Sequence, residues 1–277
     1  MKATVLGSSG YIGQAMAPYL RGLGYDVACP ARGEIDALSG DLGAVFYCIG
    51  ITGNFRTMPY QTVDAQVQVL ARLLSNPDIR FDSLVYLSST RVYGTGGDGL
   101  GREDMALSVI PSPDSTYDLS KLLGEALCAA HTGATMISVR LSNVYGPDMR
   151  EGTFLGSVLK TVADTGAVEI GEDPGSGKDY VPLDYVVRSM ELLARKGEPG
   201  CYNIATGVTV THDDIARVLR RAGYTVTFRQ GGPLRRFPAI STEKLQALGG
   251  CGPKPLLESL IDLIPNTQSR MVPDDTE

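Results

Sequence analysis

The chain opens with the glycine-rich stretch Gly7-Ser8-Ser9-Gly10-Tyr11-Ile12-Gly13, and this stretch decides the fold. Residues 2–6 before it are apolar and partly β-branched, which predicts a strand, and residues 14–20 after it have helical spacing. Strand, glycine turn and helix in this order are typical of a dinucleotide-binding site, where the helix N-terminus binds the pyrophosphate. The alternative is a glycine-rich turn that binds no ligand.

Each glycine of this stretch has its own predicted role. Gly7 permits a tight turn, Gly10 lets the backbone approach the pyrophosphate, and Gly13 lets the helix pack closely on the strand. We therefore predict that a dinucleotide cofactor is bound by the following residues: Gly7, Ser9, Gly10, Tyr11, Ile12 and Gly13.

Strand-like and helical segments alternate along the first half of the chain. We predict strands near residues 25–29, 44–49, 84–87 and 136–140, and helices at residues 60–74, 117–130 and 153–165. This order predicts an α/β fold with a doubly wound parallel sheet, the Rossmann arrangement.

The composition of the sequence changes after Pro147, where Gly and Pro are more frequent and the predicted elements are shorter. We expect a dinucleotide-binding domain over residues 1–148, with a return segment at about residues 178–206. A smaller C-terminal substrate-binding region would occupy residues 149–277, with a polar tail from about residue 265.

Composition excludes some classes of partner. The chain has 277 residues, 43% of them hydrophobic, a formal charge of −6 and a pI near 5.1. An acidic chain argues against nucleic acid as the main partner, because phosphate binding needs a basic surface. No apolar run is long enough to span a bilayer, so we expect no membrane partner.

Cysteine and histidine usage argues against a metal site. Only two histidines occur, His131 and His212, and they are far apart in sequence. Two distant histidines provide few ligands for a zinc site, and a serine–histidine hydrolase would need one of them as its base. The five cysteines show no metal or redox spacing, which predicts free thiols in a reducing cytoplasm: Cys29, Cys48, Cys128, Cys201 and Cys251.

Tyr117 and Lys121 form the candidate catalytic pair. They lie four residues apart in a predicted helix, so the ammonium can sit beside the phenol. A neighbouring cation favours the charged form of a phenol, and such a tyrosine can exchange a proton with an alcohol hydroxyl. The alternative is a pair on a solvated helix face, where this spacing is also common.

Several further segments occur in an order that resembles one family. They are residues 87–94 (LSSTRVYG), 140–147 (RLSNVYGP), 178–184 (KDYVPLD) and 202–207 (YNIATG). Together with the glycine stretch and the Tyr117/Lys121 pair, they make the chain similar to the extended short-chain dehydrogenases/reductases that act on nucleotide sugars. The resemblance runs from residue 2 to about residue 249.

This resemblance implies a catalytic role for three residues. Ser89 would hydrogen-bond the reacting sugar oxygen, and Tyr117 would be the acid/base. Lys121 would hold the nicotinamide ribose of the cofactor and lower the pKa of Tyr117. Without the resemblance, Ser89 would be read as a hydroxyl that ends a strand.

The resemblance also implies where a nucleotide sugar would bind. Thr90 and Asn143 would face the substrate, and Arg235 or Arg236 would pair with its diphosphate, which suits a guanidinium group. The alternatives are a turn residue at Asn143 and surface charges at the two arginines. Asp64 stands where the family commonly has Asn.

The end of the second predicted strand bears on the choice of cofactor. Family members that prefer NAD usually carry an acidic residue there, whereas this chain has Ala31 followed by Arg32. A guanidinium without a carboxylate suits a 2′-phosphate, so we predict that Arg32 binds NADP, with NAD as the alternative. Residues 33–43 leave room only for an abbreviated helix and strand.

The segment after Ser89 bears on the reaction. Thr90 and Arg91 replace the Asp-Glu pair of the sugar 4,6-dehydratases, so dehydration is disfavoured. The resemblance then leaves C4 epimerisation by transient oxidation to a 4-keto sugar, or NADPH-dependent reduction of a 4-keto sugar. A third hypothesis is a Rossmann protein that senses cofactor without catalysis, which the presence of Ser89, Tyr117 and Lys121 disfavours.

The resemblance further implies a homodimer. In the family, two helices of each subunit pair into a four-helix bundle, and here they would be residues 60–74 and 117–130. Both segments are apolar on more than one face, as expected if a second face is covered.

Overall fold

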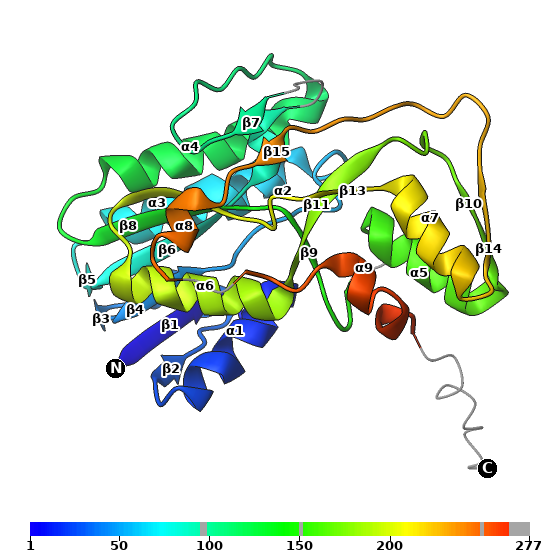
Figure 1. Ribbon diagram of the computed structural model, residues 1–277. Helices are drawn as coiled ribbons and strands as arrows, with labels where there is room; N and C mark the ends of the chain where they lie inside the picture. The colour runs from blue at the N-terminus through cyan, green and yellow to red at the C-terminus, as the bar shows by residue number, and fades with distance from the viewer. Residues whose placement is uncertain (95–98, 150–151, 250–251, 266–277) are drawn as a thin grey trace, which may run out of the picture.

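A parallel sheet of six strands forms the main body of the computed structural model, which describes residues 1–94, 99–149, 152–249 and 252–265. Helices cover both faces of this sheet (Figure 1). The strand order is β12-β8-β6-β4-β1-β2, and every neighbouring pair is parallel. The bounds are β1 Lys2–Leu6, β2 Asp26–Ala28, β4 Ala44–Tyr47, β6 Ser83–Ser89, β8 Thr135–Leu141 and β12 Gly200–Ile204. The predicted doubly wound α/β fold is confirmed.

Two apolar cores explain why these segments form a sheet between helices. On one face, α1 (Tyr11–Gly22) and α6 (Leu183–Lys196) bury side chains such as Leu20 and Met190 against the strands. On the other face, Leu70 and Leu73 pack with Leu6 of β1. Strands covered on both faces are buried along their length, as β6 is over Ser83–Ser88, and its apolar centre Leu84–Leu87 is the usual pattern of a parallel sheet.

The second face is covered by two helical stretches, and the first of these is interrupted. The helix predicted at residues 60–74 is present as α2 (Pro59–Val63), a π-helical turn η2 (Asp64–Gln68) and α3 (Val69–Ser75). The helix predicted at residues 117–130 is α4 (Thr116–Ala130). Turns of π-helix are rare and frequently occur at functional sites.

The abbreviated segment 33–43 adds no strand to the main sheet. It contains a 3₁₀ helix η1 (Arg32–Ala37) and a two-residue strand β3 (Gly40–Asp41), which pairs with β5 (Ile79–Arg80) outside the main sheet. β2 is therefore the edge strand, and the strand order reverses between β1 and β4. In open sheets of this kind, ligands bind at the carboxyl ends of the strands where the order reverses.

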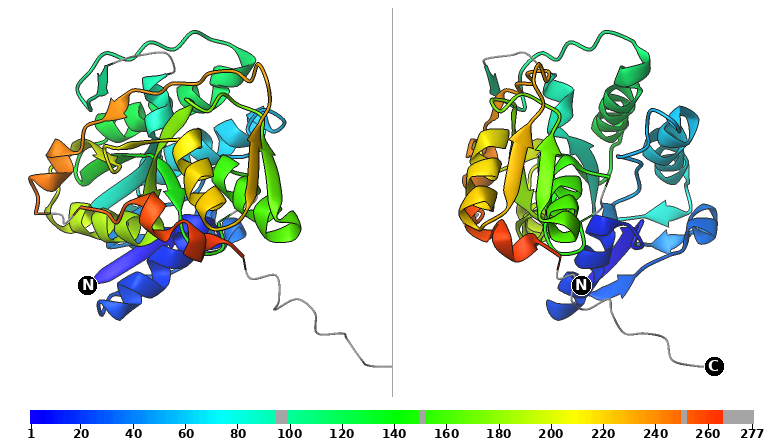
Figure 2. Two further views of the ribbon diagram at one scale, coloured as in Figure 1. Left: turned by 45° about the vertical axis from the view of Figure 1, so that its right-hand side comes forward. Right: turned by 90° about the vertical axis from the view of Figure 1, so that its right-hand side faces the viewer.

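A smaller second lobe lies beside the carboxyl edge of the sheet (Figure 2). Its core contains Leu159, Val162, Ile215 and Leu219. The lobe is built from α5 (Phe154–Thr165), α7 (His212–Arg221), α9 (Leu256–Ser259), η5 (Ile261–Leu263), the parallel pair β10 (Ala167–Ile170) and β14 (Thr225–Phe228), and the sheet β13 (Thr209–Thr211), β11 (Gly177–Pro182) and β9 (Asn143–Tyr145).

A strap at residues 229–238 leads from β14 back to the main lobe, where the chain forms β15 (Ala239–Ile240) and α8 (Glu243–Gln246). β15 pairs with β7 (Leu100–Gly101). Within the predicted return segment, β12 joins the main sheet and β11 joins the second lobe. The domain boundary at residue 148 stays a prediction.

None of the described helices is both long and apolar enough to cross a membrane. The described cysteines, Cys29, Cys48, Cys128 and Cys201, are free thiols. Cys251 and the predicted polar tail beyond residue 265 lie outside the described residues.

Candidate functional site

The glycine stretch forms a cradle at the carboxyl end of β1. Gly7 has a φ of +80°, which glycine adopts without strain, and the Gly10 N–H donates to Gly7 O at 2.9 Å. A Cβ on Gly13 would overlap with Gly7 O, and one on Gly7 would lie 2.9 Å from the carbonyl carbon of Cys48. Positions 7 and 13 therefore have no room for a side chain.

The cradle fits a dinucleotide. α1 starts at Tyr11, and in the described part of the chain no side chain caps its N-terminus. Ser9 is exposed in the same turn, beside Ile12 and Gly13 in the first turn of the helix. Unpaired N–H groups at a helix N-terminus attract phosphate, so this turn would hold the pyrophosphate of NAD or NADP. That role stays a prediction.

Tyr11 gives a further indication that a ligand binds at the cradle. Its hydroxyl is buried and has no hydrogen-bond partner among the described residues. Burial and the charge of Asp148 raise the pKa of Tyr11 to about 12, so it stays a neutral donor. A Cβ on Gly146 would lie 3.1 Å from this hydroxyl, which places Tyr11 between the glycine cradle and the segment of residues 140–147.

Arg32 lies at the first position of η1, just after the end of β2. Its side chain is exposed, and among the described residues no carboxylate forms an ion pair with it. The nearby carboxylate of Glu34 accepts from the Ala31 N–H at 2.7 Å. Arg32 is thus available for an anion beside the cradle, although its role stays a prediction.

Ser89 and Tyr117 come together at the carboxyl edge of the sheet. Ser89 is the last residue of β6, and Tyr117 lies in the first turn of α4 and is only 6% exposed. The Ser89 hydroxyl lies close enough to the Tyr117 side chain to act against the rise of its pKa. A sugar oxygen placed against both hydroxyls would face a donor and an acid/base at the same time.

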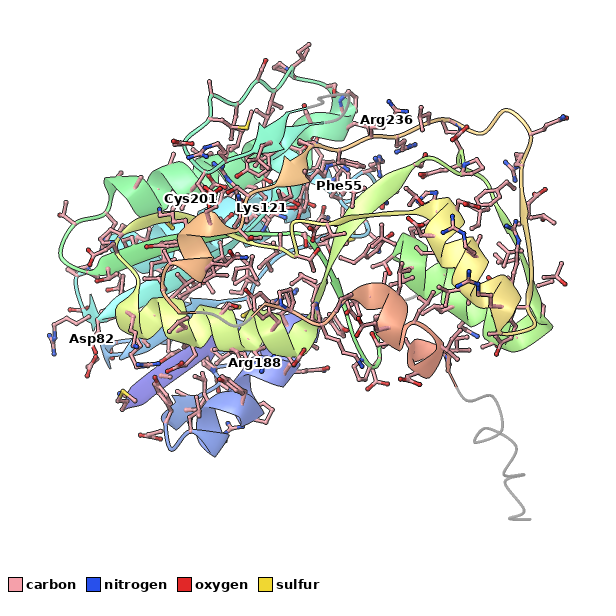
Figure 3. The ribbon with its side chains drawn as sticks, in the orientation of Figure 1. Phe55, Asp82, Lys121, Arg188, Cys201 and Arg236 are labelled. Carbon is pink, nitrogen blue, oxygen red and sulfur yellow. The ribbon has the colours of Figure 1, made fainter. Side chains whose placement is uncertain are left out.

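Lys121 lies one helical turn beyond Tyr117 and is 3% exposed. Its Nζ donates to Leu87 O at 2.7 Å and lies 5.7 Å from the centroid of the Tyr117 ring and 5.2 Å from that of Tyr86. Figure 3 shows Lys121 in the main lobe, where α4 and the sheet meet. The predicted pair is therefore inside the molecule and not on a solvated helix face.

The pKa values differ from the expectation that Lys121 lowers the pKa of Tyr117. Burial raises the pKa of Tyr117 to about 12, and Ser89 and Arg91 oppose this only in part. Burial also lowers the pKa of Lys121 to about 7, against the charge of Glu125. In the protein as described, Tyr117 is a phenol at neutral pH, because burial disfavours both charged forms.

Phe55 and Arg91 form a wall beside Tyr117 that the sequence did not reveal. The Phe55 ring centroid lies 5.3 Å from that of Tyr117, and the Arg91 guanidinium lies 4.8 Å from the Phe55 centroid. Arg91 Nε donates to both carboxylate oxygens of Asp118, at 2.9 and 3.2 Å. Phe55 comes from a loop without a motif, so no sequence signal pointed to it.

Gln66 is a second residue that sequence reasoning missed. It is fully buried in the π-helical turn, where Ser120 Oγ donates to its Oε1 at 2.6 Å and its Nε2 donates to Ile51 O at 3.0 Å. Asp64, which stands at the family's Asn position, lies at the surface, 3.9 Å from Arg72. The signal was a glutamine at helical spacing before the buried leucines Leu70 and Leu73.

Thr90 and Asn143, both expected to face substrate, are held by backbone oxygens. Thr90 Oγ1 donates to Leu141 O at 3.3 Å, and Asn143 Nδ2 donates to Asp179 O at 2.9 Å. Asn143 is exposed at the start of β9, between the two lobes. Contact of either residue with a substrate stays a prediction.

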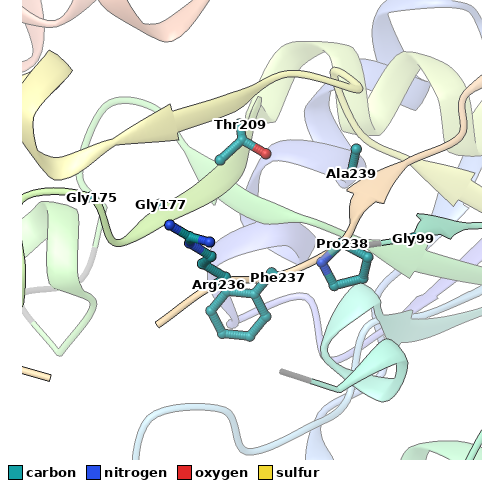
Figure 4. Close-up of a pocket in the computed structure, with 8 residues that line it drawn as sticks. All are labelled: Gly99, Gly175, Gly177, Thr209, Arg236, Phe237, Pro238 and Ala239. Atoms are coloured by element: carbon teal, nitrogen blue, oxygen red, sulfur yellow. The ribbon is translucent and has the colours of Figure 1, made fainter. Parts of the chain in front are cut away.

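The two arginines of the strap have different surroundings. Arg235 Nε lies 3.6 Å from Glu172 Oε1, whereas Arg236 lines a cavity of about 260 Å³ (Figure 4). Lys178 lies in the quoted segment 178–184 and was not predicted as a site residue. Burial lowers its pKa, and the charges of Arg235 and Arg91 lower that pKa further against the charge of Glu172. Three cations thus act on one region between the lobes.

The comparisons with known proteins identify the family. The model of the NAD dependent epimerase/dehydratase family matches residues 3–205. The chain belongs to this family. The resemblance to the extended short-chain dehydrogenases/reductases is thereby confirmed.

A curated relative in this family is the dTDP-glucose 4,6-dehydratase of Streptomyces griseus. It is 29% identical over 178 residues, which are 60% of this chain and 53% of the relative. The chain thus spans about half the length of that relative.

Solved structures of family members share the fold over nearly the whole chain. The UDP-glucuronic acid 4-epimerase of Bacillus cereus, in complex with UDP-glucuronic acid and NAD, has a TM-score of 0.78 at 20% identity. The alignment covers 97% of this chain and 99% of the epimerase chain. RMD from Pseudomonas aeruginosa, complexed with NADPH, has a TM-score of 0.79 at 22% identity, with 98% and 100% covered.

Proposed function

We propose that this protein is an NAD(P)-dependent enzyme that epimerises C4 of a nucleotide-diphosphate sugar through a transient 4-keto sugar. The observation that carries the proposal is the buried Tyr117 side chain, whose pKa is affected by Ser89 and whose ring lies 5.7 Å from Lys121 Nζ. Membership of the epimerase/dehydratase family supports it, as do the fold relatives whose complexes contain UDP-sugars or nicotinamide cofactors.

Each residue of the proposed site has its own role in the epimerisation. A bound nicotinamide supplies hydride transfer to and from C4. Tyr117 takes the proton of the C4 hydroxyl during oxidation and returns one during reduction, while Ser89 orients the oxygen. Lys121 holds the cofactor ribose and supplies positive charge near the phenol. Lys178 and Arg235 neutralise the diphosphate of the substrate.

A 4-ketoreductase is the second candidate. The exposed Arg32 favours it, because an exchangeable NADPH would need a partner for its 2′-phosphate. Dehydration is not proposed, although curated relatives are dehydratases. Thr90 lacks a carboxylate, and the nearby carboxylate of Asp118 is engaged by Arg91 through both oxygens.

The cofactor that accompanies the purified protein separates these two reactions. An epimerase retains oxidised cofactor and interconverts C4 epimers of UDP-, GDP- or dTDP-sugars without added cofactor. A reductase consumes added NADPH with 4-keto sugars. Nuclear magnetic resonance of the products, with absorbance at 340 nm, follows both reactions. If no sugar nucleotide is converted in either assay, the proposed function is wrong.

Arg32→Ala is expected to weaken NADP binding and leave NAD binding nearly unchanged. A lost charge-assisted contact of this kind is worth about 1.5–3 kcal/mol, or roughly ten- to a hundredfold in affinity. Titration calorimetry with both cofactors measures this, with Arg80→Ala as the exposed-arginine control. Equal weakening of NAD and NADP, or tighter binding of NAD by the unaltered protein, would show that the NADP preference is wrong.

We also propose a homodimer through α2–α3 and α4. Leu119 and Leu123 of α4 are 39% and 49% exposed, and Tyr60 at the start of α2 is 85% exposed. Leu123→Asp should therefore convert a dimer into a monomer, whereas Leu23→Asp, on an equally exposed leucine after α1, should not. Light scattering at micromolar concentration measures this; a monomeric unaltered protein contradicts it.

The cytoplasm is the compartment we propose. The free thiols of Cys29, Cys48, Cys128 and Cys201 support this, because proteins of oxidising compartments usually pair their cysteines.

A further inference from the structure

Three polar side chains follow one another along the inner face of α4. Tyr117, Lys121 and Glu125 are spaced four residues apart, and they therefore share one face of the helix. This face meets the end of β6, where Leu87 O accepts from Lys121 Nζ at 2.7 Å. The hydroxyl of the next strand residue, Ser88, donates to Glu125 Oε1. Glu125 is thus third in a row whose first two members are the candidate catalytic pair.

Glu125 is a buried carboxylate whose position is fixed by several donors. Its side chain is 12% exposed, and that of its partner Arg140, in β8, is 6% exposed. Arg140 Nε donates to Glu125 Oε1 at 3.0 Å, and Arg140 Nη2 donates to Glu125 Oε2 at 2.7 Å. Arg140 Nη1 also donates to the hydroxyl of Tyr93, which donates to Asn203 Oδ1 at 2.8 Å. Two-point pairing of this kind sets the geometry of the carboxylate.

The surroundings of Lys121 hold little charge apart from Glu125. Burial lowers the pKa of Lys121, and two groups raise it again, Glu125 first and Cys48 second. Burial raises the pKa of Cys48, just after β4, to about 12, so this group is a neutral thiol at pH 7. The phenols of Tyr117 and Tyr86 are neutral as well, because burial raises their pKa values. Glu125 therefore supplies the negative charge that favours the ammonium.

We propose that Glu125 is a positioning residue for the proposed reaction, and that its carboxylate keeps the Lys121 ammonium charged beside the Tyr117 phenol. This inference rests on the proposed function, to which it adds a residue that acts through Lys121. Arg140 limits the effect, since its guanidinium offsets part of the Glu125 charge. A merely structural ion pair would instead hold β8 to α4 and leave the charge of Lys121 unchanged.

Titration of Lys121 in the cofactor-free protein tests the inference directly. Nuclear magnetic resonance of protein isotopically labelled at the lysine ε-carbons reports each ammonium, and Lys121→Met assigns the signal. Glu125→Gln keeps the shape of the side chain and removes its charge. In this variant the midpoint of Lys121 should fall clearly below the pH of about 7 at which the unaltered protein holds it. Glu125→Asp keeps the charge, so its midpoint should stay closer to that of the unaltered protein.

Cofactor affinity provides a second readout. Glu125→Gln should bind NAD several-fold more weakly at pH 7 and recover most of the loss as the pH falls toward 5, where Lys121 is charged again. A distorted fold would not recover on acidification. The matched control is Glu191→Gln, on a carboxylate of α6 that is 6% exposed and paired with Arg195. This control should leave both the Lys121 midpoint and the NAD affinity unchanged.

Arg140→Met tests the inference with the opposite sign, and it does so even if Glu125→Gln fails to fold. The variant removes the cation that offsets Glu125, so the midpoint of Lys121 should move to higher pH. The double variant Arg140→Met/Glu125→Gln should lose this rise. A rise caused by loosened packing would persist in the double variant, because exposure of Lys121 to water does not depend on the carboxylate.

The outcomes separate the inference from the proposed function. A Lys121 midpoint that is equal in Glu125→Gln and in the unaltered protein, or a rise that persists in the double variant, overturns the inference. The proposed function then stays in place, because the titration involves no sugar and no turnover. If the midpoint moves as expected but no nucleotide sugar is converted, the proposed function is wrong and the positioning role falls with it.

Discussion

Replacing Tyr117 by Phe is expected to slow turnover of the nucleotide sugar by about a hundred- to ten-thousandfold, the usual contribution of a positioned acid/base. The change removes one hydroxyl from a buried ring, so the packing against Phe55 survives. No histidine can take over, because His212 belongs to the second lobe and His131 follows the far end of α4. The assay is turnover of sugar nucleotides and their 4-keto forms.

The matched control for this variant is Tyr60→Phe, on a tyrosine that is 85% exposed. Cofactor affinity of Tyr117→Phe should stay close to that of the unaltered protein, since the proposed mechanism gives the hydroxyl a contact with the reacting oxygen and none with the ribose. Turnover of Tyr117→Phe within a few-fold of normal would refute the mechanism. The family membership would then describe the fold and not the chemistry.

The pH dependence provides a second signature of Tyr117. With a pKa raised to about 12 by burial, the side chain is a phenol at neutral pH, which is the form that donates a proton during reduction. Oxidation of the C4 hydroxyl needs the phenolate, whose fraction grows as the pH rises toward that pKa. The rate of oxidation should therefore increase from pH 7 to pH 9, and this increase should be absent in Tyr117→Phe.

Lys121→Met is expected to reduce turnover by a comparable factor and, unlike Tyr117→Phe, to weaken cofactor binding as well. The ammonium donates to Leu87 O and is 3% exposed, so methionine fills the space without charge. The variant removes the charge beside the phenol and, in the proposed mechanism, the contact to the ribose. Fluorescence titration of the cofactor separates the two effects, with Lys196→Met on an exposed lysine as control.

The sign of the pH effect on cofactor binding also follows from Lys121. Burial lowers the pKa of Lys121 to about 7, so its positive charge is present below that pH and is lost above it. Affinity for the anionic NAD should fall as the pH rises from 6 to 8 in the unaltered protein and stay level in Lys121→Met. An unchanged affinity in Lys121→Met would show that the lysine does not hold the cofactor.

The order of strand, glycine turn and helix was readable from the sequence, because each depends on neighbours within a few residues. The same holds for Tyr117 and Lys121, whose spacing of four sets them on one helix face. The glycine cradle needed no tertiary information either, since its turn is closed by the local bond from Gly10 to Gly7. Local periodicity and the residue preferences of turns therefore determined the fold class and the candidate catalytic pair.

Properties set by contacts between distant elements were decided only by the tertiary structure. Burial reverses the expected pKa shift of Tyr117, and a π-helical turn brings Gln66 inward in place of Asp64. Glu172 and His212 are forty residues apart and meet only because α7 packs on the loop after β10. Burial and long-range packing depend on how the whole chain closes, and no local pattern of residues records them.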